Sequence, residues 1–249
     1  MADLPASAAR LLDRLQEELA DRADLVGIYV YGSLVTGDFS PACSDIDVVV
    51  MLAAEPDQVA VSELGKLHRS LMPADPERKL HCLYVCVDAA QDADRLCTYW
   101  FGDRMTQWQM KVLTQAELVS AAIARYGPWP PPGLRPVPVA AIQAAVRAEL
   151  TGYYRSMARR YRPWLQDTWI DHLVVALPRA EAVLTSGHLI TKGEAIARLA
   201  DFGVPASLAS EIRDRRAGLP VRPAGLRKLR RGLTARRIMR RGVQRLSRL

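Results

Sequence analysis

The sequence predicts an α+β protein, in which an N-terminal mixed sheet flanked by helices is followed by an all-helical C-terminal domain. Strand-like apolar runs and helical runs alternate over residues 4–125. Apolar side chains at helical spacing dominate residues 139–217. A stiff, proline-rich connector at residues 126–133 separates the two regions, and we expect the domain junction there.

The N-terminal region begins with leucines at helical spacing in residues 4–23, which predict an amphipathic helix packed on the sheet. The strands expected next are Val26–Tyr31, Asp45–Leu52 and Lys79–Val87, and the helices are 56–71 and 114–125. The segment Asp94–Met110 is rich in Trp, Tyr and Met. This composition favours core and lid packing over a dedicated aromatic platform for a substrate.

The C-terminal region is expected to be a helical bundle. Its predicted helices are 139–162, 167–186, 191–202 and 205–217, with Gly187 as a C-cap and Thr191 as an N-cap. We therefore predict a first domain at 1–127, a helical domain at 128–221 and a basic tail at 222–249.

Charge is concentrated at the end of the chain. The formal net charge is +7, yet residues 222–249 alone carry ten arginines and one lysine without an acid, which leaves −4 on residues 1–221. Apolar residues recur among these arginines, so the tail is expected to be either a weakly amphipathic basic helix or a solvated segment. Such a segment could hold RNA or anionic lipid through phosphate contacts.

Composition excludes several classes of protein. The 249 residues are 49% hydrophobic and 24% charged, as in ordinary globular proteins. No apolar run is long enough for a membrane span, and the N-terminus lacks signal-peptide features, so we expect a cytoplasmic protein without membrane insertion. The four cysteines lack zinc spacing and are expected to be buried, reduced thiols.

Asp45 and Asp47 carry the main chemical signal. Separated by one residue in a strand, they lie on the same face, although Asp is depleted in strands and costly to bury. Mg²⁺ would offset the pair, since it takes one or two carboxylates and keeps other positions for water and phosphate oxygens. The upstream Gly32-Ser33 turn would let the backbone approach a phosphate closely. Phosphoryl or nucleotidyl transfer is therefore indicated.

The alternative is an ordinary hairpin turn at Gly32-Ser33, with two aspartates that make an edge strand soluble. The valines that follow at positions 48–50 argue against an exposed edge.

The ordered set of strand, Gly32-Ser33 turn, loop, Asp45-x-Asp47 and apolar strand resembles the polymerase-β-like nucleotidyltransferases, and among them the aminoglycoside adenylyltransferase type. This resemblance implies a nucleotidyltransferase sheet with ATP as donor and Mg²⁺ held by Asp45 and Asp47. It also implies that Gly32 and Ser33 hold the outer phosphates and that Ser44 donates a local hydrogen bond.

One departure from this family is clear. The family has a third acidic residue on the next strand, where this chain has His81. A neutral histidine could serve as the general base at pH 7, or His81 could be a strand residue without a catalytic part. Asp88 is expected on the opposite face of that strand and is a weaker substitute.

The helical domain contributes further candidates. The Thr191-Lys192 helix start resembles the family's lysine that reaches the nucleotide phosphates, with a solvated lysine as the alternative. Asp167 and Asp171 could bind a polycationic acceptor, with Trp164 and Trp169 beside them to stack on sugar rings. An acid pair that complements the helix dipole is the alternative reading.

Three functions remain open from the sequence. The leading one is an Mg²⁺-dependent nucleotidyltransferase that transfers AMP from ATP to a hydroxyl of a small molecule, with an aminoglycoside as candidate acceptor and antibiotic resistance as the consequence. A second is a protein with altered catalysis that binds nucleotide or a protein partner. A third is a transferase on a macromolecule that the basic tail tethers.

Overall fold

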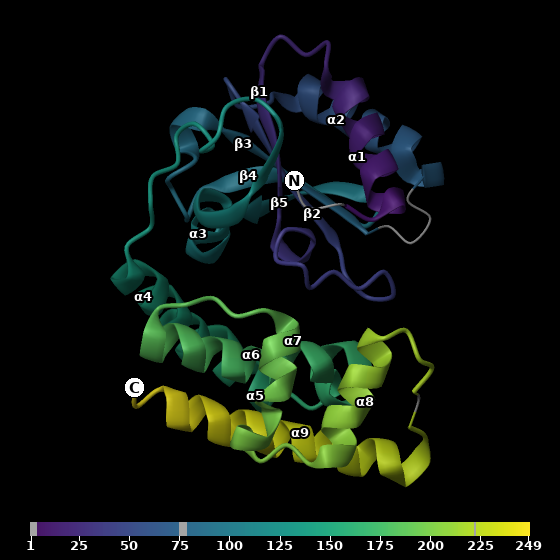
Figure 1. The fold of residues 1–249 in the computed structure, drawn as a ribbon, viewed down its shortest axis with the longest axis vertical. Coiled ribbons are helices and arrows are strands. Elements are labelled where there is room, and N and C mark those ends of the chain that lie inside the picture. The colour runs from purple at the N-terminus through teal and green to yellow at the C-terminus, as the bar shows by residue number, and fades with distance from the viewer. Residues whose placement is uncertain (1–3, 75–78, 222) are drawn as a thin grey trace. The chain divides into compact units, whose positions relative to one another are not determined.

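The computed structural model describes residues 4–74, 79–221 and 223–249 (Figure 1). The chain divides into two compact units. The first comprises residues 1–39 and 44–137, and the second comprises residues 40–43 and 138–249. Arg222, the first residue of the expected tail, lies outside the described residues.

The first unit is built on a sheet of six strands in the order β5-β4-β3-β2-β1-β6. Parallel pairing joins β2 to β3 and every other neighbouring pair is antiparallel, so the sheet is mixed, as predicted. The strands are β1 (Leu25–Tyr31), β2 (Ile46–Leu52), β3 (Leu80–Cys86), β4 (Leu96–Phe101), β5 (Arg104–Gln109) and β6 (Ile123–Tyr126).

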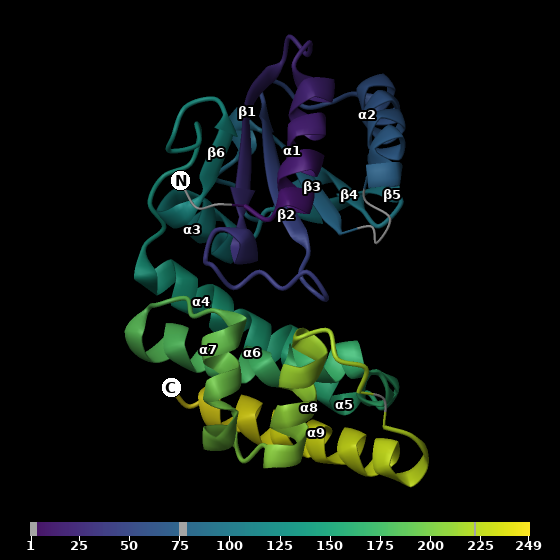
Figure 2. The same cartoon turned by 45° about the vertical axis from the view of Figure 1, so that its right-hand side comes forward.

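Helices cover both faces of this sheet (Figure 2). On one face, α1 (Ala6–Leu19) and α2 (Gln58–Leu71) bury their leucines against Val30, Val48 and Val50. On the other, α3 (Val112–Ala121) packs against the alternate residues of the same strands, with Leu118 in one cluster with Val49 and Met51. Because side chains alternate along a strand, Asp47 shares the face of Val49 and Met51.

The second unit is helical, as predicted. Its helices are α4 (Val139–Glu149), α5 (Arg155–Arg159), α6 (Asp167–Ser186), α7 (Lys192–Ala197), α8 (Ala206–Arg216) and α9 (Gly225–Leu246). Gly187 ends α6 in the left-handed conformation with φ 73°, and Thr191 starts α7 through a capping box with Glu194. Both caps agree with the sequence analysis.

The segment 94–110 forms a β-hairpin, which the sequence analysis did not assign. Its strands β4 and β5 join through a two-residue turn, in which Gly102 has φ 67° and Phe101 pairs with Arg104. The aromatic and β-branched residues of this segment are strand formers, and their alternation puts Trp100 in the core and Phe101 outside. The Trp and Met residues of the segment obscured this alternation of buried and exposed positions in the sequence.

The predicted helix at 114–125 is shorter than expected, because its last residues belong to a strand. Ile123–Tyr126 forms β6 and pairs with β1. The connector that follows stays with the first unit: Leu134 is buried in a core cluster, and the Tyr29 hydroxyl donates to the Pro128 carbonyl at 2.6 Å. Asp88, expected at the end of the third strand, lies instead in the short 3₁₀ turn Val87–Ala89.

The expected basic tail is a long helix, in agreement with the amphipathic basic helix that was one of the two alternatives, but its packing within the bundle was not predicted. One side of α9 is buried against α6, through Ala235, Ile238, Met239, Val243 and Leu246. Two glycines permit close approach: a Cβ on Gly242 would lie 2.5 Å from Leu177, and one on Gly232 would lie 2.2 Å from the Trp164 carbonyl oxygen. The arginines masked this apolar side in the sequence.

No helix of the described residues is long and apolar enough to cross a membrane. The four cysteines are free thiols, as predicted, but only Cys82 and Cys97 are buried, whereas Cys43 is exposed.

The packing of α9 predicts opposite effects for two glycine substitutions. Gly232→Ala should destabilise the chain by about 1–3 kcal/mol, because the new methyl group meets the Trp164 carbonyl. Gly152→Ala meets open space in a helical turn and should be neutral or stabilise by up to about 1 kcal/mol. Urea denaturation followed by circular dichroism measures both, and a gain of stability in Gly232→Ala would contradict the described docking of α9.

Candidate active site

Three neighbouring strands bring the predicted residues together. Tyr31 at the end of β1 pairs with Asp47 in β2, and Asp47 pairs in turn with His81 in β3. The three residues therefore stand side by side on one face of the sheet. Asp45 precedes β2 and, two residues before Asp47, points to the same side.

Both carboxylates approach one imidazole. His81 Nε2 lies 3.9 Å from Asp45 Oδ1, and His81 Nδ1 lies 3.8 Å from Asp47 Oδ1. The side chain of Asp45 is 47% exposed, that of Asp47 29% and that of His81 15%, so the cluster opens to solvent on the Asp45 side. The arrangement gathers two acids and a titratable base within reach of a bound molecule.

The Gly32-Ser33 turn lies against Asp47. A short 3₁₀ turn, Gly32–Leu34, starts directly after β1, and Gly32 has φ 71°. A Cβ on Gly32 would lie 2.8 Å from Asp47 Oδ2, so a side chain here would displace the carboxylate. Ser33 is half-buried, and Ser44, just before Asp45, is only 1% exposed. Only glycine lets the turn come this close.

Two tyrosines border the acids, and the sequence analysis did not identify them. Burial raises the pKa of the Tyr31 hydroxyl well above its ordinary value, and the charge of Asp47 adds to this. Burial, then Asp47 and Asp45, likewise raise the pKa of Tyr99. Both phenols therefore stay protonated at neutral pH and can donate hydrogen bonds. The available signal in the sequence was Tyr31 itself, a tyrosine at the end of the strand that pairs with Asp47.

Aromatic side chains of β4 and β5 continue the site. The rings of His81 and Phe101 are 4.8 Å apart between centroids, and those of Tyr99 and Trp108 are 6.4 Å apart. Phe101 is 47% exposed and Trp108 52% exposed. Other residues of the segment, Cys97, Trp100 and Met110, are buried, which agrees with the core packing expected from the sequence.

The donor set is suited to a hard cation. In the part of the chain that the structure describes, no three or more His, Cys, Asp or Glu side chains are grouped to hold a metal ion. The two carboxylates beside Gly32 supply oxygen ligands and leave further positions for water and phosphate, which is how Mg²⁺ is commonly bound. Asp45 and Asp47 therefore fit an Mg²⁺ ion that is also bound by nucleotide phosphates better than a metal ion whose ligands all come from the protein.

Trp164 does not have the role that the sequence suggested. It is 2% exposed, and its Nε1 donates to the Met157 carbonyl at 3.1 Å. Trp164 therefore packs inside the bundle, and its ring has no exposed face on which a sugar could stack. Trp169, on α6, instead reaches the surface, at 37% exposure.

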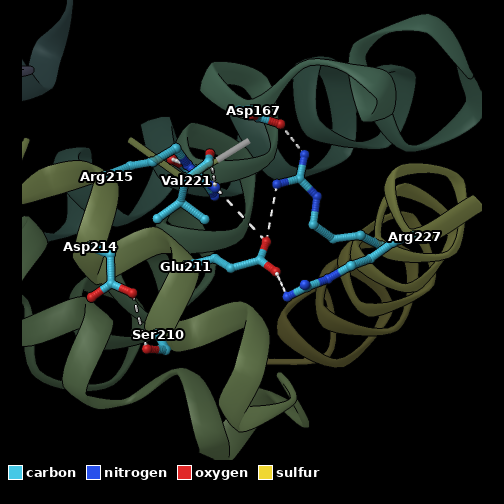
Figure 3. A network of polar contacts seen from close by, with 9 residues as sticks. Asp167, Ser210, Glu211, Asp214, Arg215, Val221 and Arg227 are labelled. Atoms are coloured by element: carbon cyan, nitrogen blue, oxygen red, sulfur yellow. Dashed lines mark hydrogen bonds and ion pairs between the residues drawn. The ribbon is translucent and has the colours of Figure 1, made fainter. Parts of the chain in front are cut away.

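Asp167 and Asp171 are bound by arginines within their own unit. Figure 3 shows this network around Asp167, Glu211 and Arg215. Arg215 donates to both oxygens of Asp171, at 2.8 and 2.7 Å, and Arg231 forms an ion pair with Asp167. Glu211 joins the network through Arg231 at 3.2 Å. Burial raises the pKa of Asp171, and Arg215 opposes this in part. The structure therefore gives both acids a cationic partner from α8 or α9, in place of the polycationic acceptor expected from the sequence.

Lys192 is exposed at the first position of α7, as the sequence predicted. Burial of His172 on α6 lowers the pKa of that side chain, and the positive charge of Lys192 lowers it further. Glu194 in the first turn complements the helix dipole that a lysine there opposes. The phosphate-binding role of Lys192 stays a prediction.

Comparison with known proteins agrees with this geometry. Residues 12–123 match the family model described as a nucleotidyltransferase domain. Among solved structures, the chain is similar to a spectinomycin adenyltransferase AAD(9) from Enterococcus faecialis, crystallised with ATP and spectinomycin. The identity is 14% over 94% of this chain and 98% of that chain, with a TM-score of 0.68. No curated protein sequence matches the chain significantly.

The matched domain holds the Gly32 turn, both aspartates and His81, and the structural similarity extends across the helical unit. Residues 12–123 therefore form a nucleotidyltransferase domain, and the chain as a whole shares the fold of the similar adenyltransferase structure.

Proposed function

We propose that this protein is an Mg²⁺-dependent nucleotidyltransferase that transfers AMP from ATP to a hydroxyl group of a small molecule. The convergence of Asp45 and Asp47 on His81, beside the Gly32 turn, carries this proposal. The nucleotidyltransferase domain match supports it, and the similar adenyltransferase was crystallised with ATP.

The acids and the turn would bind the triphosphate. Mg²⁺ held by Asp45 and Asp47 would neutralise phosphate charge and stabilise the transition state. The first N–H groups of the Gly32–Leu34 turn have no partner within the turn, and with the Ser33 hydroxyl they would donate to the outer phosphates. Tyr31 and Tyr99, both protonated, would keep the neighbouring carboxylates ordered.

His81 would act as the general base. With its proton on Nδ1, facing Asp47, the lone pair of Nε2 lies on the more exposed Asp45 side. Nε2 would take the proton of the acceptor hydroxyl as that oxygen attacks the α-phosphorus and pyrophosphate leaves. The imidazolium so formed would be stabilised by the two adjacent carboxylates.

An aminoglycoside is the acceptor we propose to test first, because the similar structure contains spectinomycin. The acids once expected to bind a polycation are occupied by Arg215 and Arg231, so other hydroxyl compounds belong in the same panel. Pyrophosphate release with ATP and Mg²⁺, together with a product heavier by one AMP, identifies the acceptor.

A nucleotide-binding protein without transfer is the second candidate, and the histidine in place of the family's third acid favours it. ATP binding without pyrophosphate release across the panel would support this candidate over the transferase.

Replacing Asp47 by Asn should lower transfer by about 10³-fold or more, since it removes one charge from the metal-binding pair while conserving shape. Steady-state rates at saturating Mg²⁺ measure the loss, and an unchanged melting temperature shows that the fold is kept. Full activity in this variant would refute the metal assignment.

Gly32→Ala and Gly37→Ala form a matched pair, because both glycines have φ 71°, a conformation in which an alanine would be strained at either position. Only the first would press a methyl group on Asp47, while the second meets nothing within 4 Å. We expect Gly32→Ala to lose at least about tenfold more of kcat/KM than Gly37→Ala. Equal losses would mean that the contact with Asp47 has no part in the activity.

His81→Gln should lower kcat by about 10²–10⁴-fold and remove the acidic limb of the pH–rate profile, because the base is lost. His81→Glu supplies the acid of the related enzymes, so it should retain much of the rate and move the acidic limb to lower pH. A pH profile unchanged in His81→Gln would show that another group takes the proton.

A further inference from the structure

The helical unit is strongly basic as a whole. Residues 138–249 hold 22 Lys and Arg against 8 Asp and Glu, a formal charge of +14, so the excess is not confined to the segment after Arg222. Nothing in the transfer chemistry of the sheet unit uses this charge. A positive field of this size attracts polyanions.

Some arginines of α9 serve the bundle. Arg227 and Arg231 form ion pairs with Glu211, Arg236 donates to the Ala158 carbonyl at 2.9 Å, and Arg245 forms an ion pair with Glu181. These four side chains account for the sides of α9 that face α5, α6 and α8, and their charges are partly neutralised.

A second set forms what we call the arginine stripe, namely Arg230, Arg237, Arg240 and Arg241. All four are exposed, and within the described part of the chain none of them has a side-chain ion pair or hydrogen bond. Spacings of three, four, seven and eleven residues place them on one side of a helix. From Arg230 to Arg241 the stripe runs about 17 Å at 1.5 Å per residue, which spans several phosphates of a nucleic-acid strand.

Neighbouring residues extend this surface. The segment 155–162 packs beside α9 and adds exposed arginines at 155, 159, 160 and 162. Tyr161 is 66% exposed, and the Arg236 guanidinium lies 4.1 Å from its ring centroid. Arginines interleaved with an exposed aromatic ring are typical of surfaces that bind single-stranded nucleic acid, where bases stack on the ring.

A lipid surface is less well matched. An interfacial helix inserts its apolar side into the bilayer, whereas that side of α9 is buried against α6. The exposed leucines of α9, at positions 226, 229 and 233, are confined to its first half. The second half exposes Arg237, Arg240 and Arg241 without an exposed apolar side chain.

We propose that the outer side of α9 binds the phosphate backbone of single-stranded RNA through the arginine stripe. Guanidinium groups bind phosphate oxygens in pairs, which suits arginine in place of lysine. Binding of this kind is independent of sequence and sensitive to salt.

The test is fluorescence anisotropy of the full chain with a labelled 30-nucleotide single-stranded RNA, over a series of KCl concentrations. Changing the four stripe arginines to Gln should weaken binding by about tenfold or more. The slope of log K against log salt should become shallower by about 3, at about 0.7 for each lost contact. The double variant Arg237→Gln/Arg241→Gln, for use if the quadruple variant does not fold, should give about half of this change.

A matched control removes four exposed arginines of the first unit, through Arg10→Gln, Arg14→Gln, Arg69→Gln and Arg135→Gln. Its salt slope should equal that of the unmodified chain. The proposal is overturned if the chain does not bind RNA, if the control loses as much as the stripe variant, or if phosphatidylglycerol vesicles retain the chain while RNA does not. Deletion of residues 222–249 is unsuitable, because it would remove the buried side of α9 from the bundle.

Discussion

Asp45 and Asp47 set two negative charges on one face of a strand whose next five residues are buried, and the surrounding structure is arranged around that charge. Like charges this close raise each other's energy unless cations or donors offset them. Because Gly32 has no side chain, the turn can lie close to Asp47. His81 stands between the two carboxylates, and protonated tyrosines border them. The sheet therefore holds an acidic site, to which, under the proposed function, a metal ion bound with the nucleotide would bring the compensating positive charge.

The second unit differs from the sheet site in the sign of its charge. It has an excess of arginine, and several of its acids link one helix to another. Asp171 and Asp167 on α6 and Glu211 on α8 hold Arg215 and Arg231, so that α6, α8 and α9 share one polar network. Arg231 and Glu211 are both buried, and removal of either would leave an uncompensated charge. The same network explains why acids that looked available to a ligand in the sequence are engaged in the structure.

Local patterns predicted much of the fold and of the site. The Asp45-x-Asp47 spacing gave the shared face because strand periodicity is two, and Gly187 and Thr191 gave helix ends because caps have strong residue preferences. What failed depends on long-range contacts. Trp164 and Trp169 are equally aromatic in the sequence, and only packing makes one core and the other surface. Tyr31 and Tyr99 reach the acids through strand pairing, which composition does not reveal. The burial of one side of α9 was not predicted, because the sequence does not show that α6 lies opposite the apolar residues between its arginines.

The docking of α9 on α6 also orders events during synthesis. The helix that covers the apolar side of α6 follows α4 to α8 in the chain, so these helices leave the ribosome before the helix that completes their core. The sheet unit contains all of its strands by Tyr126 and can pack earlier. A nascent or prematurely terminated chain would thus present a finished sheet joined to an open bundle, with Leu177 and its neighbours exposed to chaperones or proteases until the final turns of α9 are made.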